Sequence, residues 1–366
     1  MKNLFLILRI ILKTNFYSLI KINGYFVLGQ FLLSILLLNC AKTNQDNGNK
    51  LLVVYGLLST KAPTTTATTT TNPYLYVSIT THSEEGIPDP IYDTVPGTIY
   101  STYRSLTKSL VDTIYSKGAK LNYESDWRFL NAIKLYDTAS VMSNTNNKNL
   151  LRYIKEDKGF EVDAHAHESN ENYADVAYRI TLLGVTPSDN IGGFTYNATA
   201  GNATDWETMQ NSLTGRVNTS YSKKFTTLVL AGSSNHTADD KTYGAWKPKS
   251  KSEFYTHDPS KNLTFIGGGC ENVVTSTSTA ADHIATITRI SDGIKNGTYA
   301  KGNFYATNIM LNTRDYSADY ITKVGQIIDG LKSRVDAKEI QWVFHSEKKT
   351  AWETIYGSKN FQFTCP

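Results

Sequence analysis

The sequence predicts an α/β domain of the (β/α) barrel type over residues 74–366. Strand-like apolar runs alternate with amphipathic helical patterns along this part of the chain. Histidines and acidic residues follow several of the predicted strands, which is typical of parallel α/β folds, where sites form at the carboxyl ends of strands. The chain is 40% hydrophobic and 19% charged, as expected of a folded globular protein. Seven or eight predicted strands favour a barrel over an open sheet.

The N-terminal residues predict export. Four basic residues are followed by an apolar run from about Tyr25 to Leu38, which is the layout of a secretory signal peptide. Cys40 comes directly after Asn39 and resembles the lipidated cysteine of a bacterial lipobox, although a smaller residue is usual at position 39. We therefore expect residues 1–39 to be a lipoprotein signal peptide and Cys40 to carry the lipid. The protein would then sit in the bacterial cell envelope, anchored to the membrane outside the cytoplasm. An uncleaved membrane anchor is the alternative, but the apolar run is shorter than the ~20 residues of a membrane-spanning helix.

Residues 40–73 predict a disordered tether. They are rich in Asn and Thr and have little apolar surface to bury. A short strand-like patch, Leu51 to Leu58, interrupts them. Besides Cys40, the chain has only Cys270 and Cys365, which are free to pair in an oxidising compartment. The sequence does not decide whether they do.

The first half of the domain predicts strand, helix, strand, helix, strand, helix. Its second element is a helix over 100–116, because Leu106, Leu110 and Ile114 share one face and Gly118 is placed to end it. The remaining elements are strands at 75–80, 119–123 and 160–163 and helices beginning at 129, 150 and 173.

The second half is less regular. Residues 197–220 are polar and predict an excursion from the barrel, while 244–248 predict a strand end or loop. Runs of apolar and β-branched residues predict strands at 225–230, 263–266, 304–311 and 340–344, and amphipathic patterns predict helices at 281–294 and 320–335.

The stretch Gly159–Glu168 carries the strongest chemical signal. Because strand side chains alternate, Asp163, His165 and His167 face the same way. Two imidazoles and a carboxylate at the end of a strand make a suitable site for a divalent metal. The alternative is a polar loop with surface histidines.

Other predicted strand ends add candidates. His82 with Glu84 or Glu85, then Asp126, His236 and His345, each follow a predicted strand. In a barrel these positions converge on one mouth.

The run from Gly159 to His165 resembles the second motif of the polysaccharide deacetylase superfamily, and Gly118–Leu121 resembles that family's second strand. The family includes glycoside hydrolase/deacetylase-like proteins, and its fold is a distorted (β/α)7 barrel of metal-dependent carbohydrate esterases. The likeness covers about Tyr74 to Glu347. The sequence differs from the family in three places. His82-Ser83-Glu84-Glu85 stands where paired aspartates are usual, and His167 follows His165 by two residues instead of four. The family's usual Leu-x-His of the last strands is not found at Leu311, which Asn312 follows, so His236 or His345 would have to provide the acid.

The resemblance implies roles for these residues. Zinc is the expected metal, with iron, manganese or cobalt as alternatives. Glu84 or Glu85 would act as general base and His236 or His345 as general acid. The other assignments are metal ligation by His82, Asp163, His165 and His167, and substrate binding by Asp126, Trp127 and Trp246. For each tryptophan, core packing is the alternative.

The expected function is therefore that of a metal-dependent carbohydrate deacetylase-like hydrolase anchored at the envelope. The alternative is a non-catalytic surface lipoprotein that binds carbohydrate or a host partner, and a further one is a glycosidase using acids such as Glu84 and Asp126. The formal net charge of +4 is small and the basic residues are scattered, so no nucleic-acid partner is expected. We expect a monomer.

Overall fold

The computed structural model describes residues 75–83, 98–166, 171–192, 206–229, 244–250, 252–267 and 272–363. All of them lie in a compact unit spanning Thr71–Pro366. The predictions for the signal peptide, the tether and Cys40, for the Cys270–Cys365 pair, and for Glu84, Glu85, His167 and His236 lie outside the described residues. Within the described segments, no helix has the length and hydropathy needed to cross a membrane.

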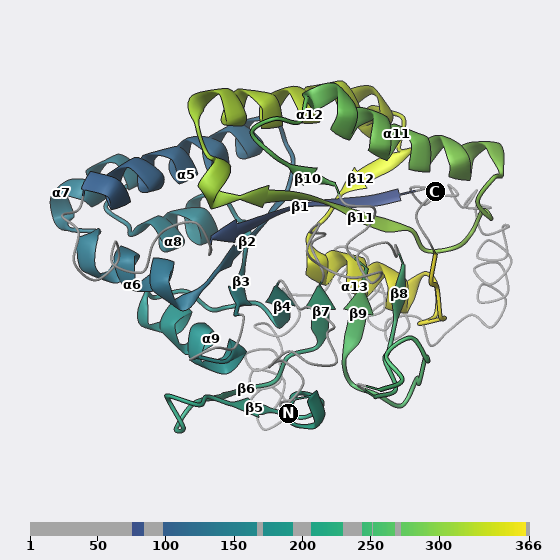
Figure 1. The fold of residues 1–366 in the computed structure, drawn as a ribbon, viewed down its shortest axis with the longest axis horizontal. Coiled ribbons are helices and arrows are strands. Elements are labelled where there is room, and N and C mark those ends of the chain that lie inside the picture. Colours follow the sequence, from purple (N-terminus) through teal and green to yellow (C-terminus); the bar gives the residue numbers. More distant parts are fainter. Residues whose placement is uncertain are drawn as a thin grey trace, which may run out of the picture. The chain divides into compact units, whose positions relative to one another are not determined.

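The centre of the fold is a curled, mainly parallel sheet (Figure 1). Its strands run in the order β10-β11-β1-β2-β3-β4-β7-β9-β8, and β12 also pairs with β1. Each of these pairings is parallel except that of β8 with β9. The strands are β1 (Leu75–Ser83), β2 (Leu121–Ser125), β3 (Glu161–His165), β4 (Asn190–Gly192), β7 (Thr227–Val229), β8 (Ala245–Trp246), β9 (Thr264–Ile266), β10 (Val273–Val274), β11 (Ala306–Asn312) and β12 (Ile340–Trp342). The predicted barrel-type α/β architecture is therefore confirmed, with β8 and β10 at the two ends of the strand order.

Helices connect most of the parallel strands, as in βαβ units. Figure 1 shows α5, α12 and α11 side by side along one side of the sheet, and the three helices contact each other in that order. The helices are α5 (Thr98–Ser116), α6 (Trp127–Tyr136), α7 (Ala139–Met142), α8 (Leu150–Arg152), α9 (Tyr173–Leu182), α10 (Trp206–Met209), α11 (Ala280–Asn296), α12 (Ala318–Asp336) and α13 (His345–Thr354). Single turns η1 (Ser143–Thr145), η2 (Tyr153–Asp157) and η5 (Thr313–Asp315) extend or replace some helix ends.

Two short strands, β5 (Leu213–Thr214) and β6 (Ser222–Lys223), were not predicted from the sequence. They form a small antiparallel hairpin within the polar excursion. The carboxylate of Asp175 on α9 accepts hydrogen bonds from the backbone N–H groups of Arg216 and Asn218, both at 2.8 Å. These bonds fasten the hairpin to the domain, and the buried side chain of Leu213 adds an apolar contact with the core.

The helix ends follow the predicted chemistry. Gly118 ends α5 with a φ of 71°, a left-handed conformation that favours glycine. Asn172 and Asp175 form a capping box at the start of α9, and Thr279 and Asp282 form another at the start of α11.

Alternation along β1 separates an apolar core from a polar interior. Leu75, Val77 and Ile79 belong to the main hydrophobic cluster. The side chains between and beyond them, Ser78, Thr80 and His82, are polar and equally buried. Since strand side chains alternate, the polar set points into the curl of the sheet. The sheet therefore buries a polar surface on its inner face, away from the helices α5, α11 and α12.

A buried ion pair ties α5 to the segment after α6. Arg104 Nε donates to Oδ1 of Asp137 at 2.6 Å, and both side chains are almost fully buried. The hydroxyl of Tyr100 and the backbone N–H of Leu150 donate to the same carboxylate. Removing the arginine would leave a buried carboxylate without its cation.

We expect Arg104→Leu to lower the free energy of unfolding by about 3–5 kcal/mol, the usual cost of breaking a buried pair on one side. Urea unfolding measures this loss. Lys332→Ala removes an exposed pair with Asp336 and should change stability by no more than about 0.5 kcal/mol. A loss below about 1 kcal/mol for Arg104→Leu would contradict the role given to the pair.

Candidate metal centre

The polar face of three neighbouring strands brings histidines and acids together. In the parallel register, His82 on β1 pairs with Glu124 on β2, and Glu124 pairs with Asp163 on β3. Alternation puts His165 on the same face as Asp163, two residues further along β3. The carboxyl ends of these strands therefore carry four metal-binding side chains at neighbouring positions.

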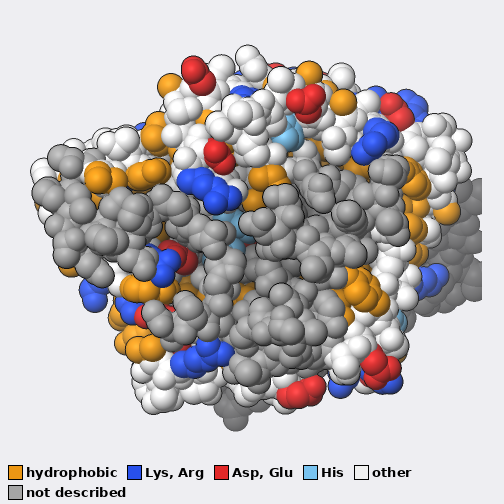
Figure 2. All heavy atoms as spheres, viewed as in Figure 1, with side chains coloured by type: hydrophobic (Ala, Val, Ile, Leu, Met, Phe, Trp, Pro, Cys, Tyr) orange, Lys and Arg blue, Asp and Glu red, His pale blue; other side chains and the backbone are white. Residues whose placement is uncertain are grey.

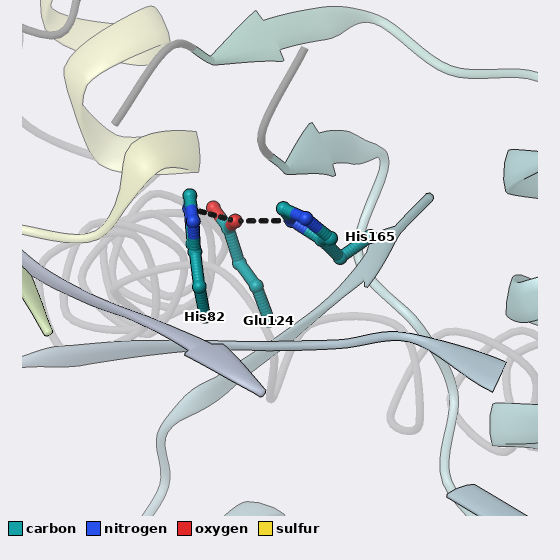
Figure 3. Close-up of side chains that lie close together, drawn as sticks. All are labelled: His82, Glu124 and His165. Carbon is teal, nitrogen blue, oxygen red and sulfur yellow. Dashed lines mark hydrogen bonds and ion pairs between the residues drawn. The ribbon is translucent and has the colours of Figure 1, made fainter. Parts of the chain in front are cut away.

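Glu124 is the centre of the group (Figure 3). Its Oε2 lies 2.9 Å from Nε2 of His82 and 3.1 Å from Nδ1 of His165. The two imidazole rings lie 4.4 Å apart between centroids and are tilted by 52°. All three side chains are buried, Glu124 and His165 completely. One carboxylate oxygen of Glu124 thus lies within hydrogen-bond distance of a nitrogen of each imidazole.

The spacing of these atoms fits a divalent metal. His82, Glu124 and His165 offer one ligand atom each within 4.8 Å of the others. Ligands bound to zinc at about 2.0–2.1 Å in a tetrahedral arrangement lie about 3.3 Å apart, close to the two distances measured here. Two imidazoles and a carboxylate are also a ligand set that zinc and iron accept in hydrolytic sites.

Electrostatics favour an ionised Glu124. Burial by itself raises the pKa of a carboxyl, but the charges of His82 and His165 and their hydrogen bonds outweigh it and lower the pKa of Glu124 to about 2. The carboxylate is therefore charged at neutral pH and available to a cation. Its second oxygen, Oε1, accepts no hydrogen bond within the described part of the chain.

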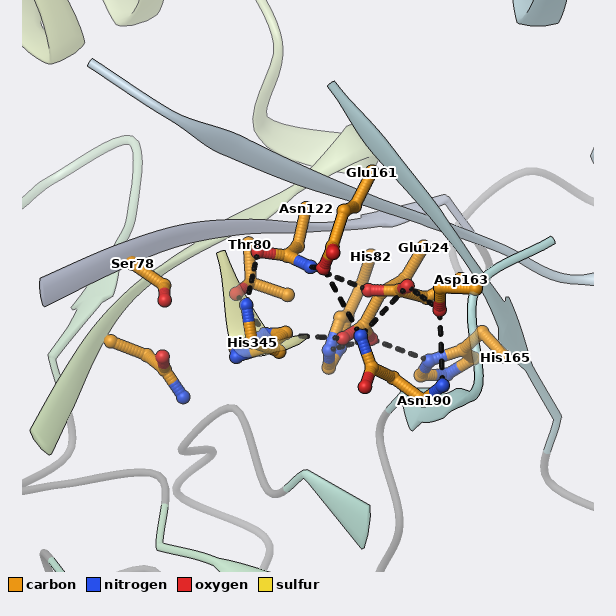
Figure 4. Close-up of polar contacts among 12 residues, drawn as sticks. Ser78, Thr80, His82, Asn122, Glu124, Glu161, Asp163, His165, Asn190 and His345 are labelled. Carbon is orange, nitrogen blue, oxygen red and sulfur yellow. Dashed lines mark hydrogen bonds and ion pairs between the residues drawn. The ribbon is translucent and has the colours of Figure 1, made fainter. Parts of the chain in front are cut away.

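A network of amides holds the neighbouring acids in place (Figure 4). Asn122 donates to Oε2 of Glu161 at 2.7 Å and to Oδ2 of Asp163 at 2.8 Å. Asn190 donates to the same two carboxylates at 3.1 and 3.3 Å, and Ser188 also donates to Asp163. Burial and the charges of Glu161 and Glu124 raise the pKa of Asp163 well above its usual range. Added positive charge at this position would therefore stabilise the ionised form of Asp163.

His345 enters the same cluster from α13. In Figure 1, α13 lies inside the curl of the sheet, and it contacts β7 and β9. The Nε2 atom of His345 lies 3.0 Å from Oγ1 of Thr80 and 3.9 Å from Oε1 of Glu124. Burial and the nearby charge of Lys348 lower the pKa of His345 well below its ordinary value. The imidazole is therefore neutral at physiological pH, the form that accepts protons or binds metals.

Lys348 lies one turn further along α13 and is fully buried. Its Nζ donates to the carbonyl oxygen of Thr307 at 2.7 Å and to Oδ1 of Asn308 at 2.6 Å. Burial lowers the pKa of this amine well below its usual range.

The three predicted substrate-binding residues lie in different surroundings. Asp126 caps α6, where its carboxylate accepts from the N–H of Phe129 at 3.0 Å. Trp127 is partly buried against the core, with Arg128 and Arg179 over its ring at 5.2 and 5.8 Å. Asp126 and Trp127 are the first two residues after β2.

Trp246 is a correction to the sequence interpretation. It is fully buried, its ring packs against Phe254 and Phe265, and its Nε1 donates to the carbonyl of Phe254 at 2.7 Å. No ring face remains for a sugar, so Trp246 is a core residue.

Glu124 was missed by the sequence analysis. The predicted second strand ended at Tyr123, whereas β2 continues through Glu124 to Ser125. With the strand extended by one alternation, Asn122 and Glu124 fall on one face, and both turn out to line the centre. The alternation of side chains along the sequence therefore indicated Glu124, but the predicted strand ended before reaching it.

Figure 2 shows the surface of the molecule from the side of Figure 1. The described acidic and basic side chains lie interspersed there, with hydrophobic side chains in small groups between them.

Comparisons with known proteins give structural likenesses at low identity. No family model matches the chain, and no curated protein matches it. Among solved structures, a probable polysaccharide deacetylase from Pseudomonas aeruginosa PAO1 is similar over 77% of this chain and 91% of that one, at 13% identity and a TM-score of 0.47. A protein from Parabacteroides distasonis assigned as a glycoside hydrolase/deacetylase is similar over 77% and 71%, at 11% identity and a TM-score of 0.47.

A third similar structure is the 4-alpha-glucanotransferase from Thermococcus litoralis, at 10% identity and a TM-score of 0.44. The match covers 76% of this chain and spans only 40% of that protein. Polysaccharide deacetylases, the family that the motif before His165 resembles, are thus present among similar structures.

The position of Glu124 predicts a pH effect on stability. Its folded-state pKa of about 2 lies below the ordinary value of 4.5 for a glutamate, so the ionised group stabilises the fold above about pH 4.5. This contribution, about 3 kcal/mol, is lost as the pH falls towards 2. In metal-free protein, we expect the wild type to lose stability over this range while Glu124→Gln loses about 3 kcal/mol less. Urea unfolding at a series of pH values measures the difference.

Glu253→Gln is the matched control, because Glu253 forms only an exposed pair with Lys249. It should follow the wild-type pH profile. Parallel profiles for wild type and Glu124→Gln would show that the histidines do not stabilise the Glu124 carboxylate.

Proposed function

We propose that this protein is a metal-dependent hydrolase of the carbohydrate deacetylase type. The observation that carries the proposal is the convergence of His82, Glu124 and His165 from three neighbouring parallel strands. Burying two imidazoles and a carboxylate is costly unless they are paired or bind a cation. A bound metal ion would offset the free-energy cost of burying these side chains and would also supply catalytic chemistry.

His82, Glu124 and His165 would hold the metal. The chemistry supplied by a divalent ion at this position is Lewis-acid polarisation of an acyl carbonyl and a lowered pKa for water. A centre with three protein ligands leaves coordination positions for substrate and water.

The residues around these ligands have supporting roles. Asn122 and Asn190 keep Glu161 and Asp163 in fixed orientations, which positions the acids beside the centre. His345 is neutral, so it serves as a proton acceptor or a ligand, and the role of proton donor passes to His236 among the residues that the sequence suggested. The proposal keeps Glu84 or Glu85 as the general base on sequence grounds alone.

The carbohydrate part of the proposal rests on the motif before His165, which resembles that of polysaccharide deacetylases. Trp127 keeps its proposed role in substrate binding because it is partly exposed beside the carboxyl end of β2, although Arg128 and Arg179 lie over its ring. Anchoring in the cell envelope through lipid on Cys40 belongs to the same proposal and rests on the N-terminal sequence.

The test is metal content and acetate release by the full-length chain. We expect bound zinc or a similar divalent metal in the wild type, and release of acetate from N- or O-acetylated oligosaccharides. A His82→Ala, His165→Ala double variant should lose the metal and at least about 100-fold of the activity, the scale on which electrostatic catalysis acts. Elemental analysis and an acetate assay measure the two effects.

His257→Ala is the control, because His257 lies in a different part of the domain, where its Nδ1 accepts from the backbone of Lys247 at 3.0 Å. It should keep metal and activity. A wild type that binds no metal after reconstitution would contradict the proposal. Metal without hydrolysis of any acetylated carbohydrate would favour the non-catalytic binding lipoprotein instead.

A further inference from the structure

Among the described residues, two groups of side chains have the spacing needed to hold a metal ion. His82, Glu124 and His165 are the first, and Glu124, Asp163 and His345 are the second. In each group the ligand atoms lie within 4.8 Å of one another, and every member is buried. Glu124 belongs to both groups, so the two share one carboxylate.

The two oxygens of Glu124 face different groups. Oε2 lies close to His82 and His165, as described above. Oε1 lies on the side of His345, whose Nε2 is 3.9 Å away. A carboxylate that directs one oxygen to each of two ligand sets has the arrangement of a bridging ligand between two metal ions, which in two-metal enzymes lie about 3.5–4 Å apart.

Two buried atoms in the second group lack a partner. Oε1 of Glu124 and Nδ1 of His345 make no hydrogen bond with any described residue, although both side chains are completely buried. Buried polar atoms are normally satisfied. A cation held by the second group would give Oε1 of Glu124 a partner.

Asp163 completes the second group. Its carboxylate is held by amides of Asn122 and Asn190 and by the hydroxyl of Ser188. Each carboxylate oxygen has two acceptor positions, so these bonds leave capacity for a cation. Hydrogen-bonded carboxylates of this kind are typical of metal ligands whose orientation is fixed by a surrounding shell.

We propose that the domain binds two divalent metal ions, with Glu124 bridging a first site at His82 and His165 and a second site at Asp163 and His345. The inference rests on the proposed function, because it adds a second metal to the same centre. It assigns Asp163 and His345 to one ion and makes the interior helix α13 a source of metal ligands.

The test is the metal stoichiometry of the full-length chain, loaded with Mn²⁺ and freed of excess ion. We expect two equivalents in the wild type and an electron paramagnetic resonance spectrum with exchange coupling between two Mn²⁺ ions. Asp163→Asn and His345→Asn should each fall to one equivalent and lose the coupling, while thermal unfolding confirms that they fold. Two controls remove buried groups elsewhere, Asp175→Asn and His283→Asn, and both should keep two equivalents.

The outcomes separate the two proposals. One equivalent in the wild type with an uncoupled spectrum would overturn the second site and leave the proposed function standing. No bound metal would overturn both. Two equivalents retained in Asp163→Asn and His345→Asn would place the second ion elsewhere and overturn the assignment. If either variant fails to fold, the wild-type stoichiometry and coupling still decide whether two ions share the centre.

Discussion

The site depends on a charged carboxylate buried among imidazoles. Glu124 is completely buried, and an isolated carboxylate in such a place would be strongly destabilising. His82 and His165 approach one of its oxygens within about hydrogen-bond distance, and this contact outweighs the cost of burial enough to keep the group ionised. Such a grouping is expensive to maintain for stability alone, because apolar residues of the same size would often serve as well. The cost is understandable where the carboxylate is needed for binding or chemistry.

The fold supplies this grouping through strand alternation. Along β1, one set of side chains joins the apolar core and the other lines a polar interior. β2 and β3 continue the polar row with Asn122, Glu124, Glu161 and Asp163, which lie together in Figure 4. Because the strands are parallel and in register, residues far apart in the sequence reach the same level of the sheet. The last helix, α13, then adds His345 and Lys348 from the inner side.

The sequence was sufficient to predict most of the elements and the face of the central strand. Apolar periodicity located the long helices α5, α11 and α12, since a helix of many turns repeats its pattern often enough to be read. The pair His165 and His167 indicated a site at the end of β3. His165 does lie beside His82, the histidine predicted after the first strand. Short strands were harder to predict. The predicted second strand ended two residues before the end of β2, which hid Glu124. Trp246 on β8 packs in the core against Phe265 of the partner strand β9.

The place of His345 was also beyond the sequence. A histidine after a final strand suggested the mouth of a barrel, whereas the structure uses it to begin a helix that packs inside the sheet. Nothing in the local pattern distinguishes these two outcomes, because α13 is buried by long-range contacts. The same contacts remove Lys348 from solvent and set the protonation of both groups.

Anomalous X-ray scattering at the zinc edge, from crystals of the zinc-loaded full-length chain, would test the central claim most directly. The account predicts an anomalous peak about 2.0–2.2 Å from a carboxylate oxygen of Glu124 and from a nitrogen of each of His82 and His165. A zinc peak elsewhere in the molecule, with the two histidines still hydrogen-bonded directly to Glu124, would contradict it.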